Sequence, residues 1–188
     1  MYNIAIFASG NGSNAQRISE YFIENENVHI ALILSNNPNA FVLERAKNLK
    51  IPSFVFSSKE LKETDRVLNK LKEFNINFIV LAGFLLMIPK NIITAFPEKI
   101  INIHPALLPK YGGKGMYGDI VHEAVIAAGE AESGISIHYV NEHYDEGNII
   151  FQAKCNIEKN DSPKSLAEKV HQLEYRFFSE IIEKLLIV

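Results

Sequence analysis

The stretch INIHPALLPKY at residues 101–111 follows an apolar run and contains two prolines. Asn102 and His104 are two residues apart, so on an extended backbone their side chains point to the same face. Pro105 biases His104 toward extended geometry, and Pro109 keeps the following segment from becoming helical. An amide and an imidazole side by side at a strand end are typical of catalysis in an open α/β sheet. A capping Asn and an ordinary surface His would give the same pattern.

Strand-like and helix-like segments alternate before this stretch. Short apolar runs predict strands at 3–8, 28–34, 52–56, 78–81 and 100–103. Helical periodicity or a helix-starting residue predicts helices that follow Ala15 and that cover 41–49, 61–74 and 89–96. Five strand–helix units predict a three-layer α/β/α fold with a Rossmann-like, mostly parallel sheet.

The pattern changes after residue 111. The glycine-dense residues 111–118 predict a loop, and a helix is expected over 121–128. Residues 134–140 alternate strictly and 149–157 form another apolar run, so the short connection between them predicts an antiparallel pair. Ser162 and Pro163 predict the start of a last helix that runs to about Leu186.

Length and composition narrow the class of protein. We expect a single domain over residues 1–188, which is 47% hydrophobic and 22% charged. The net charge of −3 argues against nucleic acid as a partner. Cys155 is the single cysteine, which excludes an internal disulfide and fits a cytoplasmic protein. We expect neither a signal peptide nor a membrane partner, and either a monomer or a homodimer.

A glycine-rich loop joins the first strand to its helix. Residues 9–15 read SGNGSNA, and such a loop binds phosphate through backbone N–H groups at the helix start, although a tight structural turn would look the same. The second strand ends in Ser35-Asn36-Asn37, without the acidic residue that a dinucleotide site needs. We therefore expect a single phosphate, with Ser13 and Asn14 adding side-chain hydrogen bonds.

Two further segments carry candidate site residues. Residues 84–88 are apolar and follow Gly83, so they form either the wall of a flat ligand pocket or simple core. Asp145 precedes Gly147 and is either a partner of a catalytic histidine or a loop-capping carboxylate. His138 and His143 lie nearby, but no metal-binding signature is present and we predict no metal.

These motifs together resemble the folate-dependent formyltransferase family. They are SGNGSN at 9–14, VLAGF at 80–84, NIHPALLPKY at 102–111, SGISIH at 133–138, and Asp145 before Gly147. The resemblance covers essentially the whole chain in order. Residues 113–118 and His171, where the family pattern leads us to expect Gln, depart from it.

The resemblance implies transfer of a formyl group from the co-substrate 10-formyltetrahydrofolate to the amine of 5′-phosphoribosylglycinamide, a step of purine synthesis. It implies a seven-stranded sheet whose next-to-last strand is antiparallel, with phosphate binding in the N-terminal half and folate binding and catalysis in the C-terminal half. The implied substrate-binding residues are Gly12, Ser13, Asn14 and Glu174. The implied folate-binding residues are Leu85, Leu86, Met87, Ile88, Asn102, Asn141, Glu142, His143 and Tyr144.

Formyl transfer explains why the chemistry needs Asn102, His104 and Asp145. Negative charge builds on the formyl oxygen when the amine attacks, and preorganised donors stabilise it. Asn102 donates from its amide, and His104 donates best as imidazolium, so we expect Asp145 to raise the pKa of His104 and to assist proton transfer. We predict no covalent enzyme intermediate.

Two alternatives remain open. A related formyl-folate enzyme, such as a formyltetrahydrofolate hydrolase or a methionyl-tRNA formyltransferase, would share the motif around His104 but would be expected to carry an additional domain. A folate- or nucleotide-binding module would not need Asn102, His104 and Asp145 together.

Overall fold

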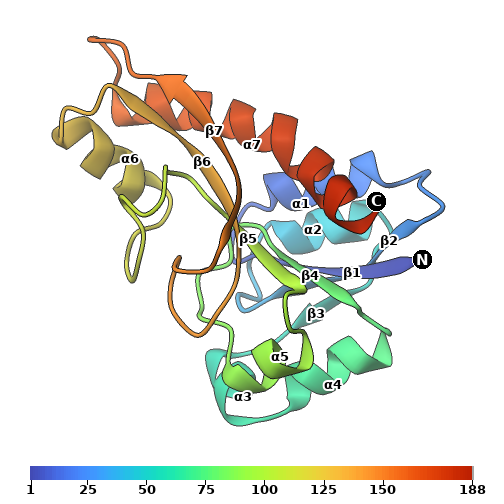
Figure 1. The fold of residues 1–188 in the computed structure, drawn as a ribbon. Coiled ribbons are helices and arrows are strands. Elements are labelled where there is room, and N and C mark those ends of the chain that lie inside the picture. Colours follow the sequence, from blue (N-terminus) through green and yellow to red (C-terminus); the bar gives the residue numbers. More distant parts are fainter. Residues whose placement is uncertain (188) are drawn as a thin grey trace.

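A seven-stranded sheet lies at the centre of the computed structural model, which describes residues 1–187 (Figure 1). The strands are β1 (Tyr2–Phe7), β2 (Val28–Ser35), β3 (Ser53–Val55), β4 (Phe78–Leu81), β5 (Ile100–His104), β6 (Glu132–Tyr139) and β7 (Ile149–Asn156). The helices are α1 (Ser13–Tyr21), α2 (Val42–Asn48), α3 (Ser58–Glu63), α4 (Arg66–Glu73), α5 (Lys90–Ala95), α6 (Asp119–Ala127) and α7 (Pro163–Leu186). Val188, the last residue of the predicted domain, lies outside the described residues.

The strand order is β3-β2-β1-β4-β5-β6-β7. Pairing is parallel from β3 through β5, whereas β6 runs antiparallel to both β5 and β7. The predicted fold class and its antiparallel next-to-last strand are therefore confirmed. The chain crosses from β3 past β2 and β1 to reach β4, so the loops that follow the neighbouring strands β1 and β4 diverge. Open α/β sheets bind ligands at such a point.

Helices cover both faces of the sheet, with α1, α2, α6 and α7 on one side and α3, α4 and α5 on the other (Figure 1). Along β1, Ile4 and Ile6 belong to the first core, and Ala5 and Phe7 belong to the second. All four are fully buried, as expected for a strand with both faces covered. This rigid central layer fixes the position of the loops at its carboxyl edge.

The prediction of a single helix over 61–74 is wrong. The structure divides this segment into α3 and α4, and Thr64 between them is extended, with φ −138° and ψ 163°. The Thr64 hydroxyl donates to the carbonyl of Glu60 and accepts from the amide of Arg66, so it satisfies backbone groups that an unbroken helix would pair. Both helices still bury apolar side chains, which explains why the periodicity continued across the break.

Every helix in the part of the chain that the structure describes is too short or too polar to cross a membrane.

Candidate active site

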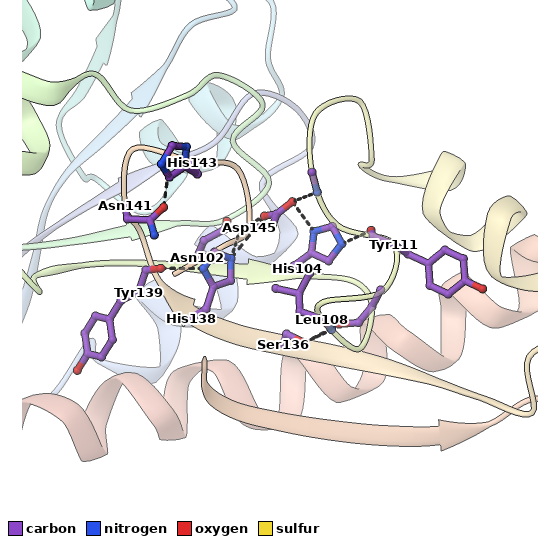
Figure 2. A network of polar contacts seen from close by, with 12 residues as sticks. Asn102, His104, Leu108, Tyr111, Ser136, His138, Tyr139, Asn141, His143 and Asp145 are labelled. Carbon is purple, nitrogen blue, oxygen red and sulfur yellow. Dashed lines mark hydrogen bonds and ion pairs between the residues drawn. The ribbon is translucent and has the colours of Figure 1, made fainter. Parts of the chain in front are cut away.

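Strand β5 carries Asn102 and His104 on one face, and β6 aligns partners beside them. Asn102 is opposite His138 and His104 is opposite Ser136 in the antiparallel register. The Ser136 hydroxyl donates to the carbonyl of Ala106 and accepts from the amide of Leu108, so it holds the proline-bounded loop in place. The predicted Asn/His pair thus lies at a strand end that is fixed on both sides (Figure 2).

His104 is buried, and both ring nitrogens face defined partners. Nε2 lies 2.7 Å from the carbonyl oxygen of Tyr111, and Nδ1 lies 3.5 Å from Oδ2 of Asp145. A carbonyl oxygen can only accept, so Nε2 carries a hydrogen and donates it. The neutral ring is therefore the Nε2–H tautomer, and Nδ1 toward Asp145 is the atom that gains or loses a proton.

The predicted rise in the pKa of His104 is wrong. Burial lowers this pKa below its ordinary value and outweighs the opposing influence of the Asp145 carboxylate and the Tyr111 carbonyl. The carboxylate is present where it was expected, but the His104 side chain is only 4% exposed, and desolvation disfavours its charged form more strongly. At neutral pH the resting site therefore holds a neutral His104.

Asp145 is the centre of the polar cluster in Figure 2. It lies in the loop between β6 and β7 with a φ of 56°, a left-handed conformation that Asp adopts more readily than most residues. Its Oδ2 accepts from the amide of Gly113 at 2.9 Å. Burial raises the pKa of Asp145, but contacts with His138, His104 and the Gly113 amide outweigh it, so the net direction is downward. Asp145 is therefore a carboxylate at neutral pH.

The sequence assigned no firm role to His138, but in the structure its ring contacts both Asn102 and Asp145. Nδ1 lies 2.8 Å from the carbonyl oxygen of Tyr139 and must donate to it, which leaves Nε2 to accept from the Asn102 amide at 3.1 Å. Nε2 also lies 3.5 Å from Oδ1 of Asp145. His138 therefore sets the orientation of the Asn102 amide. In the sequence, only the alternation of His138 with Ile135 and Ile137 indicated that its side chain lies on one particular face of the strand.

His143, which was considered with His138 as a metal ligand, is exposed in the loop 141–145, where its backbone amide donates to the side-chain oxygen of Asn141. Among residues 1–187, no three His, Cys, Asp or Glu side chains are arranged to hold a metal ion.

A cavity of about 420 Å³ extends from the glycine loop to these residues. Its walls come from segments that are distant in the sequence, namely residues 9–14, 82–85, 102–105, 113, 115–119 and the inner face of α7. Asn102, His104 and Asp145 line one end, and Gly12, Ser13 and Asn14 line the other. The structure thus brings together the predicted catalytic and phosphate-binding residues.

The glycine loop is shaped by two local constraints. Gly12 has a φ of 74°, and a Cβ there would lie 2.3 Å from Cγ2 of Val42, so only glycine fits beside α2. Ser9 donates to Asn36 at 2.6 Å and accepts from the amide of Leu85 at 3.0 Å, which ties together the loops after β1, β2 and β4. Sequence reasoning missed this link because neither partner is close in the chain.

Glu174 reaches the cavity from α7 and is 5% exposed. Its Oε2 accepts from the Asn14 amide at 2.9 Å and lies 3.0 Å from Nδ1 of His171. The predicted substrate-binding carboxylate therefore lies beside the glycine loop and is tied to it through Asn14.

A second, smaller pocket of about 60 Å³ adjoins the first. The predicted folate-binding residues that line it are Leu86, Met87, Ile88, Asn102, Asn141, His143 and Tyr144. Leu85 instead lines the larger cavity, and Glu142 lines neither, because its carboxylate lies 3.4 Å from the ammonium of Lys90. The loop 84–88 and the loop 141–145 face each other across this pocket, as expected.

Comparison with known proteins agrees with this arrangement. The family model described as formyl transferase matches residues 2–182. Phosphoribosylglycinamide formyltransferase of Bacillus subtilis is 35% identical over 99% of this chain and 95% of its own length. The enzyme named phosphoribosylglycinamide formyltransferase, chloroplastic, of Arabidopsis thaliana is 38% identical over 95% of this chain, which spans 63% of that relative's length. The chain therefore belongs to the formyl transferase family.

Solved structures give the same result for the fold. Glycinamide ribonucleotide transformylase 1 of Geobacillus kaustophilus superposes with a TM-score of 0.89 at 34% identity, and the alignment covers 99% of each chain.

Proposed function

We propose that this chain transfers a formyl group from 10-formyltetrahydrofolate to the amine of 5′-phosphoribosylglycinamide, a step of purine biosynthesis. Its membership in the formyl transferase family supports the reaction class. The names of its bacterial and plant relatives support the acceptor.

One observation carries the proposal: the two pockets meet at the catalytic residues. Asn102 and Asp145 line both of them, together with Phe84 and Tyr144. A direct transfer needs two substrates whose reacting atoms touch at the same groups. A module that bound one ligand would have no use for this junction.

The two substrates divide the site between them. The phosphate of the acceptor binds the backbone N–H groups of Gly12, Ser13 and Asn14 at the start of α1, and Glu174 accepts from its ribose hydroxyls. The folate ring system occupies the smaller pocket, where the apolar side chains of Leu86, Met87 and Ile88 face a flat ring and Asn141, His143 and Tyr144 form the other wall.

The proton moves through His104 and Asp145. At rest Asp145 is ionised and Nδ1 of His104 is unprotonated, so the pair accepts the proton that the attacking amine loses. The carbon–nitrogen bond of the folate then breaks, and the same pair returns the proton to the leaving nitrogen. No enzyme group becomes covalently attached.

The oxyanion is stabilised in the same step. Asn102 donates from its amide, and His104 becomes an imidazolium as it takes up the proton, so a positive charge arises just when the formyl oxygen becomes negative. An imidazolium already present at rest would stabilise the ground state as well. A charge that forms during the attack stabilises the transition state more than the ground state.

The test is a spectrophotometric assay of folate release from a 10-formyl folate donor, with and without 5′-phosphoribosylglycinamide. We expect release that requires the glycinamide and that falls at least about 100-fold in Asp145→Asn. The matched control is Asp65→Asn, an exposed carboxylate that lines neither pocket, and it should retain wild-type activity.

Other outcomes would assign a different function. Release without the glycinamide would identify a formyltetrahydrofolate hydrolase. Folate binding without any release would leave a binding module and would refute the enzyme.

We propose a cytoplasmic location and either a monomer or a homodimer. The plant relative is named chloroplastic, so the location is tested by fluorescence microscopy of the tagged protein in its own cell. Light scattering of the purified chain measures its assembly state.

A further inference from the structure

Tyr111 ends the stretch INIHPALLPKY, and its backbone has a left-handed conformation with a φ of 57°. A residue with a Cβ adopts this conformation at a cost in free energy, and such residues cluster at functional sites. In this conformation the Tyr111 carbonyl oxygen lies 2.7 Å from Nε2 of His104, while the tyrosine ring points away from the polar cluster (Figure 2). The strained residue is therefore the one whose carbonyl selects the tautomer of His104.

Residues 111–113 form a short segment that also holds Asp145. Gly113 donates from its amide to Oδ2 of Asp145 at 2.9 Å. A Cβ at Gly112 would lie 2.5 Å from Cδ2 of Leu108 and 3.2 Å from the Cβ of Asp145, so the segment packs closely against the carboxylate. The segment thus contacts both members of the pair that accepts the proton, and any shift of its backbone would move both.

A carboxylate outside the cavity holds the side chain of Tyr111. The phenol hydroxyl donates to Oε1 of Glu130 at 2.8 Å, and the partly buried ring packs against the first core. Lys110 donates to the same oxygen, but its side chain is largely exposed. Neither Tyr111 nor Glu130 lines the larger cavity or the smaller pocket. Their contact therefore reaches the site only through the backbone of Tyr111.

The position of Glu130 is fixed by the end of α6. Gly129 has a φ of 67°, and its amide donates to the carbonyl of Ile126 at 3.0 Å. The amide of Glu130 lies 3.5 Å from the carbonyl oxygen of Val125. These two contacts form the Schellman motif that closes a helix, so Glu130 starts from a well-defined point of the backbone. It is suited to anchor the tyrosine.

We propose that Tyr111 and Glu130 are positioning residues that hold His104 as the Nε2–H tautomer, with Nδ1 facing Asp145. This inference deepens the proposed function and rests on it. With the phenol tied to Glu130, the Tyr111 carbonyl stays within hydrogen-bonding distance of Nε2. Without the tie, Tyr111 relaxes from its left-handed conformation, and the neutral imidazole can place its hydrogen on either nitrogen. A hydrogen on Nδ1 would prevent this atom from accepting the proton of the attacking amine.

The first test measures the tautomer of His104 by NMR in the full chain without substrates. The nitrogen chemical shifts of an imidazole distinguish the nitrogen that carries hydrogen from the unprotonated one, at about pH 8, where an ordinary imidazole is neutral. Wild type should show hydrogen on Nε2 alone, whereas Tyr111→Phe and Glu130→Ala should each show a mixture of both tautomers. Glu130→Gln should keep the single tautomer, because its amide oxygen still accepts from the phenol. A single Nε2–H tautomer in both Tyr111→Phe and Glu130→Ala would overturn the proposal.

The second test is the formyl-transfer assay at the same pH. Tyr111→Phe and Glu130→Ala should each lower kcat about tenfold, because the proton acceptor is misplaced. The KM of both substrates should stay unchanged, because neither residue lines their pockets. The double variant should lose no more than either single variant, because both changes remove the same hydrogen bond. Losses that add in the double variant would show that the two residues act separately and would overturn the proposal.

The matched control is Glu132→Ala. This exposed carboxylate, two residues after Glu130, accepts from the ammonium of Lys154 at 2.9 Å. Its removal also breaks a surface ion pair with a lysine but leaves the phenol of Tyr111 in place. Both kcat and the single tautomer of His104 should therefore stay as in wild type.

The two proposals fail differently. If wild type requires the glycinamide for turnover and both Tyr111→Phe and Glu130→Ala keep its kcat, the positioning role is wrong although the proposed function stands. If wild type shows no glycinamide-dependent turnover while the two variants still mix the tautomers of His104, the positioning pair stands and the acceptor is wrong.

Discussion

His104 carries its hydrogen on Nε2 because the partner of that atom is a carbonyl oxygen, and this leaves Nδ1 as the working atom beside Asp145. Activity should therefore depend on the unprotonated form of this atom. Burial lowers the pKa of His104 below its ordinary value of 6.5, so kcat should be constant near neutral pH. It should fall about tenfold per pH unit once the pH drops below that pKa.

The measurement is kcat against pH at saturating concentrations of both substrates. A plateau that ends above pH 6.5, or a rate that falls as pH rises through neutrality, would show that His104 works from its protonated form. Asp65→Asn serves as the comparison, because this exposed carboxylate lines neither pocket and its removal should leave the acidic limb of kcat in place.

At the scale of single residues, the sequence predicted the pair Asn102 and His104, because a two-residue period and the flanking prolines are local signals. The contact of His138 with Asn102 depends on the register of β5 against β6, which brings together residues 36 positions apart. The direction of the His104 pKa could not be predicted either, because it depends on how deeply the ring is buried.

Strands β6 and β7 approach so closely at Gly134 that a Cβ there would lie 1.9 Å from the carbonyl oxygen of Ala153. Gly134→Ala must push the two strands apart, and we expect a loss of about 3 kcal/mol or more in the free energy of unfolding. Urea denaturation monitored by circular dichroism measures this loss.

The matched control is Ser133→Ala in the same strand. The Ser133 hydroxyl is buried and has no hydrogen-bond partner among the described residues, so its removal should be neutral or slightly stabilising. Equal urea midpoints for Gly134→Ala and Ser133→Ala would contradict the close approach of the strands.

The seven predicted strands all form, because apolar runs and alternation are strong signals at the scale of one element. The division of 61–74 into α3 and α4 was not predicted. The hydroxyl of Thr64 forms hydrogen bonds with backbone groups, and these bonds replace those of a continuous helix. The spacing of the apolar residues is the same with or without the break, so the sequence pattern did not reveal it.

The whole molecule should respond to its ligands as a single unit. The cavity joins both halves of the chain, so bound substrate opposes unfolding of either half. A ligand at 100 times its Kd adds about 2.7 kcal/mol, which should raise the Tm by about 5–10 °C for a chain of this size. Differential scanning calorimetry with 5′-phosphoribosylglycinamide measures this shift.

Gly12→Ala is the informative variant in that experiment. A Cβ at Gly12 collides with Val42, so the glycine loop must move and the shift in Tm on adding the glycinamide should largely disappear. A variant that keeps the full shift would show that the phosphate does not bind at this loop.

The site is completed by α7, which is synthesised after the sheet and the glycine loop. The glycine loop and α1 are synthesised well before α7, yet Asn14 donates to Glu174 and Tyr21 donates to Glu183, both on α7. During synthesis from the N-terminus at about 5–20 residues per second, the nascent chain therefore exposes an uncovered α1 until α7 leaves the exit tunnel. A stop codon ahead of α7 would release a chain with most of its sheet and an open phosphate site, and this truncated product would be a substrate for chaperones and proteases rather than a partial enzyme.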